Sequence, residues 1–175
     1  MKSRALIGFL ILGSLAAAAC SDDPPMAPSP ATSTATFTAA LMPSSEVPPV
    51  AGNEANGSGT ATLKFNLTKD AAGYVTAATM DATVSVTGFP AGTALTASHI
   101  HPGAAGANGG VFVNLGLAAG EVTFATGSGS FTKQGVTVTV DEANTIMANP
   151  AGYYLNIHTA ANPGGVARGQ LARTQ

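Results

Sequence analysis

The stretch Thr96-Ala97-Ser98-His99-Ile100-His101-Pro102-Gly103 has the pattern of a β-strand that ends in a turn. Side chains two positions apart on a strand lie on the same face, so His99 and His101 are predicted to project together. Ile100 then projects to the opposite face, and the Pro-Gly pair that follows is typical of a turn. If Ile100 faces the core of the protein, both imidazoles lie on the outer face of the sheet.

The stretch Tyr153-Tyr154-Leu155-Asn156-Ile157-His158 has the same alternation and contains the last of the three histidines in the chain. Its leucine and isoleucine are predicted to point into the core, so His158 points outward together with Tyr154 and Asn156. The segment Asn162-Pro163-Gly164-Gly165 that follows has the composition of a turn. All three imidazoles are therefore expected on the outer face near strand ends, where loops can fold over them.

From Ala35 onward, the residue pattern of the chain is typical of an all-β protein. Thr, Val and Ala alternate with a period of two, and turns that contain glycine recur at short intervals. The predicted strands are Ala35–Leu41, Thr60–Leu67, Tyr74–Val86, Leu95–His101, Val111–Leu115, Glu121–Phe131, Val136–Val140, Tyr153–His158 and Val166–Ala172. A bulge is predicted near Met80, and a helix over Asp141–Ala148 with Asp141 as its cap. About eight short strands in one domain favour an all-β Greek-key β-sandwich or barrel.

Three segments of the chain together resemble the CHRD (chordin-type) domain family. They are Phe37 to Val50, which includes Glu46-Val47-Pro48-Pro49-Val50, then Thr96 to Leu115, and then Tyr153 to Leu171. The resemblance covers roughly Ala35 to Ala172 and implies a sandwich similar to that of the Cu/Zn superoxide dismutases. Chordin itself carries additional cysteine-rich modules and antagonises growth factors. This chain has none of those modules, so that activity is not expected here.

The N-terminus has the pattern of a secretory signal. Lys2 and Arg4 precede an apolar run over residues 5–19, which is shorter than the roughly 20 apolar residues of a spanning helix. Cys20 follows at once, in an arrangement that resembles a bacterial lipobox and implies lipidation of the cysteine. Ala17 stands where the lipobox usually has leucine, so a plain signal peptide without lipidation is the alternative.

The segment after Cys20 is predicted to be a tether. Residues 20–34 are rich in Pro, Ser and Thr and contain little to bury, which is typical of a disordered linker. Residues 35–175 would form the single CHRD domain. The sequence thus predicts an extracytoplasmic, membrane-anchored lipoprotein that faces the periplasm or the cell surface.

Charge and motifs exclude several classes of function. Without residues 1–19 the chain has five Lys and Arg against nine Asp and Glu, a formal charge of −4. A nucleic acid is therefore not expected as a partner, because phosphate contacts need clustered basic side chains. The chain also has no Gly-x-Ser-x-Gly elbow and no phosphate-binding glycine loop. We therefore expect no catalytic residue and no enzymatic activity.

The histidines have two interpretations. His99 and His101 present two imidazoles on one strand face, and His158 would complete a three-histidine site for copper or zinc. Alternatively, the imidazoles hold loops in place by hydrogen bonds to backbone carbonyls or to nearby carboxamides. The nearby carboxamides are those of Asn108, Asn114, Asn156 and Asn162. Superoxide dismutation by the mechanism of the Cu/Zn enzymes is excluded, because those enzymes use more histidine ligands and a disulfide.

Arg168 is expected to have a structural role. The related motif has a glutamate two residues before this arginine, but Val166 occupies that position here. Arg168 is therefore predicted to pair with Glu46 or another carboxylate across the sheet. We expect a non-enzymatic binding or structural module of the cell envelope with an unknown envelope or extracellular partner. The alternative is a copper or zinc binding module, to which a metal-dependent oxidoreductase role would be an extension.

Overall fold

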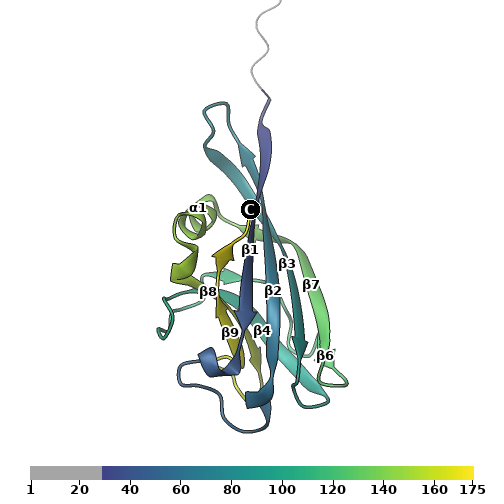
Figure 1. Cartoon of the computed structure of the whole chain (residues 1–175). Coiled ribbons are helices and arrows are strands. Elements are labelled where there is room, and N and C mark those ends of the chain that lie inside the picture. The colour runs from purple at the N-terminus through teal and green to yellow at the C-terminus, as the bar shows by residue number, and fades with distance from the viewer. Residues whose placement is uncertain (1–28) are drawn as a thin grey trace, which may run out of the picture.

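The computed structural model describes residues 29–175 as two antiparallel β-sheets that pack face to face (Figure 1). The predicted signal peptide, Cys20 and residues 21–28 of the predicted linker lie outside the described residues. The first sheet contains β1 (Ala31–Leu41), β2 (Ser58–Lys69), β3 (Val75–Thr87), β7 (Gly129–Val138) and β10 (Ala172–Arg173), in the order β10-β1-β2-β3-β7.

The second sheet has the order β5-β4-β8-β9, and β6 pairs with β4 outside this path. Its strands are β4 (Thr93–Pro102), β5 (Val113–Asn114), β6 (Thr123–Phe124), β8 (Tyr153–Thr159) and β9 (Ala167–Gln170). The helical segments are α1 (Val140–Ala148) and the short 3-10 turns η1 (Pro43–Ser45), η2 (Asn53–Asn56) and η3 (Pro150–Gly152). Within residues 29–175, no helix is long and apolar enough to cross a membrane.

The prediction of a Greek-key β-sandwich is confirmed. The chain leaves the first sheet after β3, forms β4 to β6 in the second sheet, and returns as β7 beside β3. Within the described residues the two sheets do not close into a barrel. Their edges approach where Met42, just after β1, forms an isolated bridge with Arg168 in β9.

The core lies between the sheets and consists of the inward side chains of alternating positions. On β1 and β2, for example, Phe37 and Phe65 are fully buried and meet edge to face, with ring centroids 5.4 Å apart. On the second sheet Ile100, Leu155 and Ile157 are also fully buried. These three residues fix the orientation of β4 and β8, and therefore the face on which the histidines lie.

Some strand boundaries differ from the prediction. β1 begins at Ala31, so residues 31–34 of the predicted linker are strand, and they pair in register with the end of β2. The predicted strand Glu121–Phe131 is wrong, because the chain turns at Gly127 and separates β6 from β7. A side chain on Gly127 would lie 1.9 Å from the carbonyl oxygen of Phe89, so this turn packs against the backbone of the Phe89 segment.

Other predicted boundaries on this side of the fold are also corrected. Residues 136–138 belong to β7 and are not a strand of their own, because β7 continues through the bulge. That bulge lies at the predicted place, since the pairing of β3 with β7 shifts between Met80 and Ala82. The extra residue is on β7, where Gly135 takes a positive φ of 63° and donates its N–H to Asp81 Oδ1 over 2.9 Å.

The cap of α1 is Thr139, not the predicted Asp141. The Thr139 hydroxyl accepts from the Glu142 N–H, and the Glu142 carboxylate accepts from the Thr139 N–H. This reciprocal pair satisfies two amides that the first turn leaves unpaired. The predicted strand Val111–Leu115 is likewise shorter than expected, because only Val113 and Asn114 pair with β4.

Candidate three-histidine site

The two histidine-bearing strands lie side by side. β4 pairs with β8 so that His99 is opposite Asn156, and His101 is opposite Tyr154. Because Ile100 and the aliphatic side chains of β8 face the core, all three imidazoles lie on the outer face. The orientation predicted from the alternation is therefore confirmed.

The imidazoles form one cluster. The ring centroids are separated by 5.5 Å between His99 and His101, and by 5.0 Å between His99 and His158. His101 and His158 have centroids 5.8 Å apart. One ring nitrogen from each histidine can be chosen so that the three atoms lie within 4.8 Å of one another. Strand pairing thus brings together residues separated by up to 59 positions in the sequence.

The outer face at this position is covered. His101 and His158 are each only 6% exposed, and His99 is half-buried. The covering residues come from the segments that follow β4 and β8, since both Gly109 and Pro163 contact the imidazoles. These are the two loops that the sequence predicted to fold over the histidines.

Hydrogen bonds to these loops fix which nitrogen of the His101 and His158 rings carries the proton. His101 Nδ1 lies 3.1 Å from the carbonyl oxygen of Gly109 and 2.9 Å from that of Gly110. His158 Nδ1 lies 3.0 Å from the carbonyl oxygen of Pro163. A carbonyl only accepts, so both Nδ1 atoms must donate, and Nε2 of each neutral ring keeps its lone pair.

The lone-pair nitrogens are placed differently in the two rings. His158 Nε2 lies 3.2 Å from His99 Nδ1. His101 Nε2 is fully buried and has no hydrogen-bond partner among the residues that the structure describes. A buried acceptor without a partner is uncommon in folded proteins. The cluster therefore contains an acceptor that no group of residues 29–175 satisfies.

All three histidines are held in the neutral form at neutral pH. Burial lowers the pKa of His99, and the neighbouring His101 lowers it further. Burial also lowers the pKa of His101, against the opposing effect of its two carbonyl partners. The pKa of His158 is lowered to about 4, mainly by burial. Neutral imidazoles are the form that binds a metal ion.

One of the three nitrogen–nitrogen spacings in the cluster fits a metal ion. With metal–nitrogen bonds of about 2.0–2.1 Å, two tetrahedral ligands lie about 3.3 Å apart. The separation of 3.2 Å between His99 Nδ1 and His158 Nε2 is close to this value. The carbonyl bonds at Nδ1 are also the usual arrangement around a metal-binding histidine, because they orient the ring and raise its basicity. The loop-holding and metal-binding interpretations therefore use different nitrogens of His101 and His158.

The carboxamides expected to hold the imidazoles do not do so. Within residues 29–175, the described partners of the imidazoles are backbone carbonyls and another imidazole. Asn108 instead bonds to Arg168 and to the carbonyl of Val47. Asn162 bonds to Glu54. The loops contact the imidazoles with backbone carbonyl groups and not with their asparagine side chains.

Arg168 forms the predicted ion pair with Glu46, with 2.7 Å between Nε and Oε2. Its guanidinium also lies 4.4 Å from the ring centroid of Tyr154. The other face of this tyrosine stacks on His101, with centroids 5.1 Å apart and planes at 14°. The Tyr154 hydroxyl accepts the N–H of Gly109 over 3.2 Å. Sequence reasoning placed Tyr154 on the right face but missed this stack, which depends on the register between β4 and β8.

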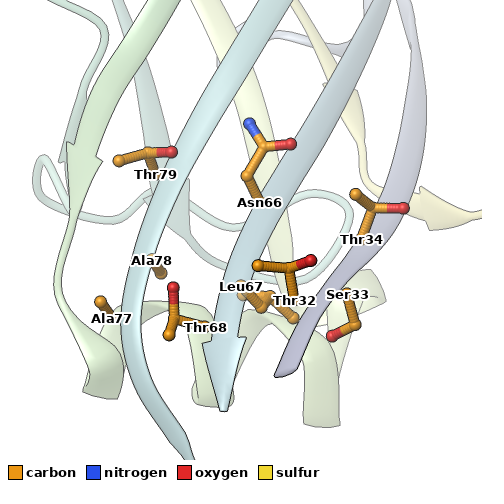
Figure 2. Close-up of a pocket in the computed structure, with 9 residues that line it drawn as sticks. All are labelled: Thr32, Ser33, Thr34, Asn66, Leu67, Thr68, Ala77, Ala78 and Thr79. Carbon is orange, nitrogen blue, oxygen red and sulfur yellow. The ribbon is translucent and has the colours of Figure 1, made fainter. Parts of the chain in front are cut away.

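A larger hollow than the one beside the histidines lies elsewhere. It has a volume of about 530 Å³ and lies on the first sheet, between the ends of β1, β2 and β3 (Figure 2). Its lining is made of threonines, small residues, Leu67 and Asn66, with no titratable side chain. A smaller hollow of about 380 Å³ lies directly against all three histidines. The smaller hollow therefore differs from the larger one in having titratable side chains on its wall.

The fold and the site define a class of protein: an antiparallel β-sandwich whose second sheet carries a covered cluster of neutral imidazoles. The model of the CHRD domain matches residues 37–171, and the chain belongs to the CHRD domain family. The membership supports a binding or structural module. A search of the curated proteins found no match, and neither did a search of the solved structures.

Proposed function

We propose that this domain is a non-enzymatic binding module that holds one copper or zinc ion through His99, His101 and His158. The observation that carries the proposal is the buried, unpartnered Nε2 of His101, whose ring is oriented by two carbonyls at Nδ1. Leaving a buried acceptor without a partner costs about 1–3 kcal/mol. A bond to a metal ion would offset that cost.

The other two histidines support the same site. His158 has its Nδ1 fixed by a carbonyl, as His101 has, and its Nε2 faces His99 at a ligand-like separation of 3.2 Å. Three imidazoles without a thiolate suit copper or zinc better than magnesium or calcium, which prefer oxygen ligands. Since one position would stay open, the ion would be accessible from the hollow beside the rings.

We also propose that the module acts outside the cytoplasm, attached to a membrane through Cys20. This part rests on the sequence alone: the basic and apolar N-terminus, the single cysteine after it, and the Pro-rich segment that follows. Its test is metabolic labelling with a fatty acid in a bacterial host. The label is expected on the wild-type chain and absent from Cys20→Ser, and a label that survives this substitution would refute the anchor.

The metal site is tested by the metal content of the purified full chain after loading with Cu²⁺ or Zn²⁺ and removal of free ion. One ion per chain is expected for the wild type, and much less than one for His99→Ala/His101→Ala. The matched control is Thr60→Ala/Ser85→Ala, two exposed positions paired on the first sheet, which should keep the full ion content.

The outcomes separate the two interpretations of the histidines. If the wild type and the histidine variant both hold no metal, and the variant unfolds more easily, the histidines only hold the loops. If the histidine variant retains a full equivalent of metal, the ion is bound elsewhere and the proposal is wrong.

A further inference from the structure

We infer that the metal-loaded site takes a small monodentate anion, such as a carboxylate, as its fourth ligand, in the hollow bounded by the three histidines and Val111. The inference rests on the proposed metal site and names the ligand that this site would receive. It follows from the shape of the hollow, the donors that the protein supplies and the resulting charge.

The histidine cluster supplies three donors from the described residues. Within residues 29–175, the described group that could hold an ion contains His99, His101 and His158, with no carboxylate or thiol among them. The nearby carboxylate of Glu46 is engaged by Arg168 at 2.7 Å. The fourth position is therefore open to a ligand from outside the described residues.

The hollow gives that ligand a place. Its volume is about 380 Å³, and all three imidazoles lie on its wall. The rest of the wall is made of glycines, an alanine, a threonine, a proline and Val111. Val111 is 57% exposed, so it stands at the solvent side of the hollow. An incoming ligand would pass small or apolar groups that carry no charge.

The charge favours an anion. Three neutral imidazoles leave the full positive charge of the ion uncompensated, and no charged side chain lines the hollow. A bound ion is then the largest local charge. The electrostatic attraction between this ion and an anion is stronger in the hollow than between the same anion and a hydrated ion in water. Binding is a simple exchange, in which the anion forms a bond to the ion and a coordinated water molecule leaves.

The test uses the full chain loaded with one equivalent of Cu²⁺ and titrated with sodium azide, followed by the absorption band of an azide–copper bond. One azide per copper is expected to bind. Val111→Trp, which would fill the mouth of the hollow, is expected to raise the azide Kd about tenfold while copper content stays the same. Thr60→Trp, at an exposed position on the other sheet, is the size-matched control and should not change the Kd.

A second pair of variants tests the charge. Val111→Glu should raise the azide Kd at least several-fold relative to Val111→Gln, because the glutamate has nearly the same shape and places a negative charge at the mouth. Suppose that copper is bound, but that Val111→Trp has the same azide affinity as Thr60→Trp and Val111→Glu has the same azide affinity as Val111→Gln. The anion then does not use this hollow, and the inference is wrong. If the wild type holds no copper, the proposed metal site fails and the inference falls with it.

Discussion

The Arg168 guanidinium donates from Nε to Oε2 of Glu46 over 2.7 Å, and both side chains are almost completely buried. The same guanidinium donates to the carbonyl of Ala107 and to Asn108 Oδ1. One buried cation therefore joins the segment after β1 to the loop that covers His101. Burial raises the pKa of Glu46, and the ion pair with Arg168 opposes that rise.

Removal of the cation alone should be severe. Arg168→Met is expected to lower the free energy of unfolding by about 3–5 kcal/mol, because the carboxylate of Glu46 would stay buried without its partner. Denaturant unfolding measures this loss. The double variant Arg168→Met/Glu46→Gln should recover part of it. If the double variant is as unstable as the sum of the two single changes, the two side chains do not act as a pair.

Gly109 should be far less replaceable than its neighbour Gly110. A side-chain carbon on Gly109 would lie 1.8 Å from the carbonyl oxygen of Pro102, whereas one on Gly110 would meet nothing within 4 Å. Gly109→Ala must therefore shift the loop whose carbonyl orients His101. We expect a loss of about 1–3 kcal/mol in the free energy of unfolding.

The matched control is Gly110→Ala, which should change the free energy of unfolding by less than about 0.5 kcal/mol. Thermal or denaturant unfolding of both variants gives the comparison. In a metal titration, only Gly109→Ala should show weakened binding. Equal effects of the two substitutions would show that the close approach to Pro102 does not hold the loop.

Alternation along the strands predicted much of this site, because period two is a local property of the chain. It oriented His99 and His101 correctly around Ile100. The ion pair of Arg168 with Glu46 was also predicted. It was inferred because Val166 stands where the related motif has a glutamate, so Arg168 needed another carboxylate as its partner. Each of these conclusions needed only residues close in sequence or a single complementary charge.

What the sequence did not predict depends on register and on competition between local choices. The stack of Tyr154 on His101 arises because β4 and β8 pair at one particular offset, with His101 opposite Tyr154. No local pattern encodes that offset. Thr139, and not Asp141, caps α1 because Glu142 stands three residues after Thr139. The two residues can therefore form the reciprocal hydrogen bonds of a capping box.

The Tyr154 ring should matter more for the metal site than its hydroxyl. One face of the Tyr154 ring stacks on His101, and the Arg168 guanidinium lies over the other face of the same ring. The hydroxyl, in contrast, only accepts the N–H of Gly109. Tyr154→Leu is expected to weaken Zn²⁺ binding by about tenfold or more, in the range of other residues that orient a ligand. Tyr154→Phe should keep the affinity within a few-fold.

Isothermal titration of both Tyr154 variants with Zn²⁺ measures this difference. Denaturant unfolding without metal serves as the control for a general loss of structure. If Tyr154→Phe weakens binding as much as Tyr154→Leu does, the hydrogen bond to Gly109, and not the stack, orients His101.

The metal-free protein should lose stability as the pH falls from about 6.5 to about 4. The unfolded chain binds a proton on His158 at its ordinary pKa of 6.5, whereas the folded protein resists protonation until the pH reaches about 4. Between these values the unfolded state holds more protons, so the free energy of unfolding decreases as the pH falls. The loss from His158 alone is about 3 kcal/mol across the window. The pKa values of His99 and His101 are also lowered and add in the same direction.

Denaturant unfolding at several pH values, with a chelator present, measures this slope. His158→Asn removes the titrating group, so the variant should be less stable at pH 7 but show a shallower decline between pH 6.5 and 4. Thr60→Ala, an exposed and uncharged change on the other sheet, should keep the wild-type slope. A wild-type stability that stays constant across this window would mean that the imidazole of His158 titrates in the folded protein much as it does in the unfolded chain. The cover provided by the Pro163 loop would then be open in solution, and the cluster would be accessible to protons without unfolding.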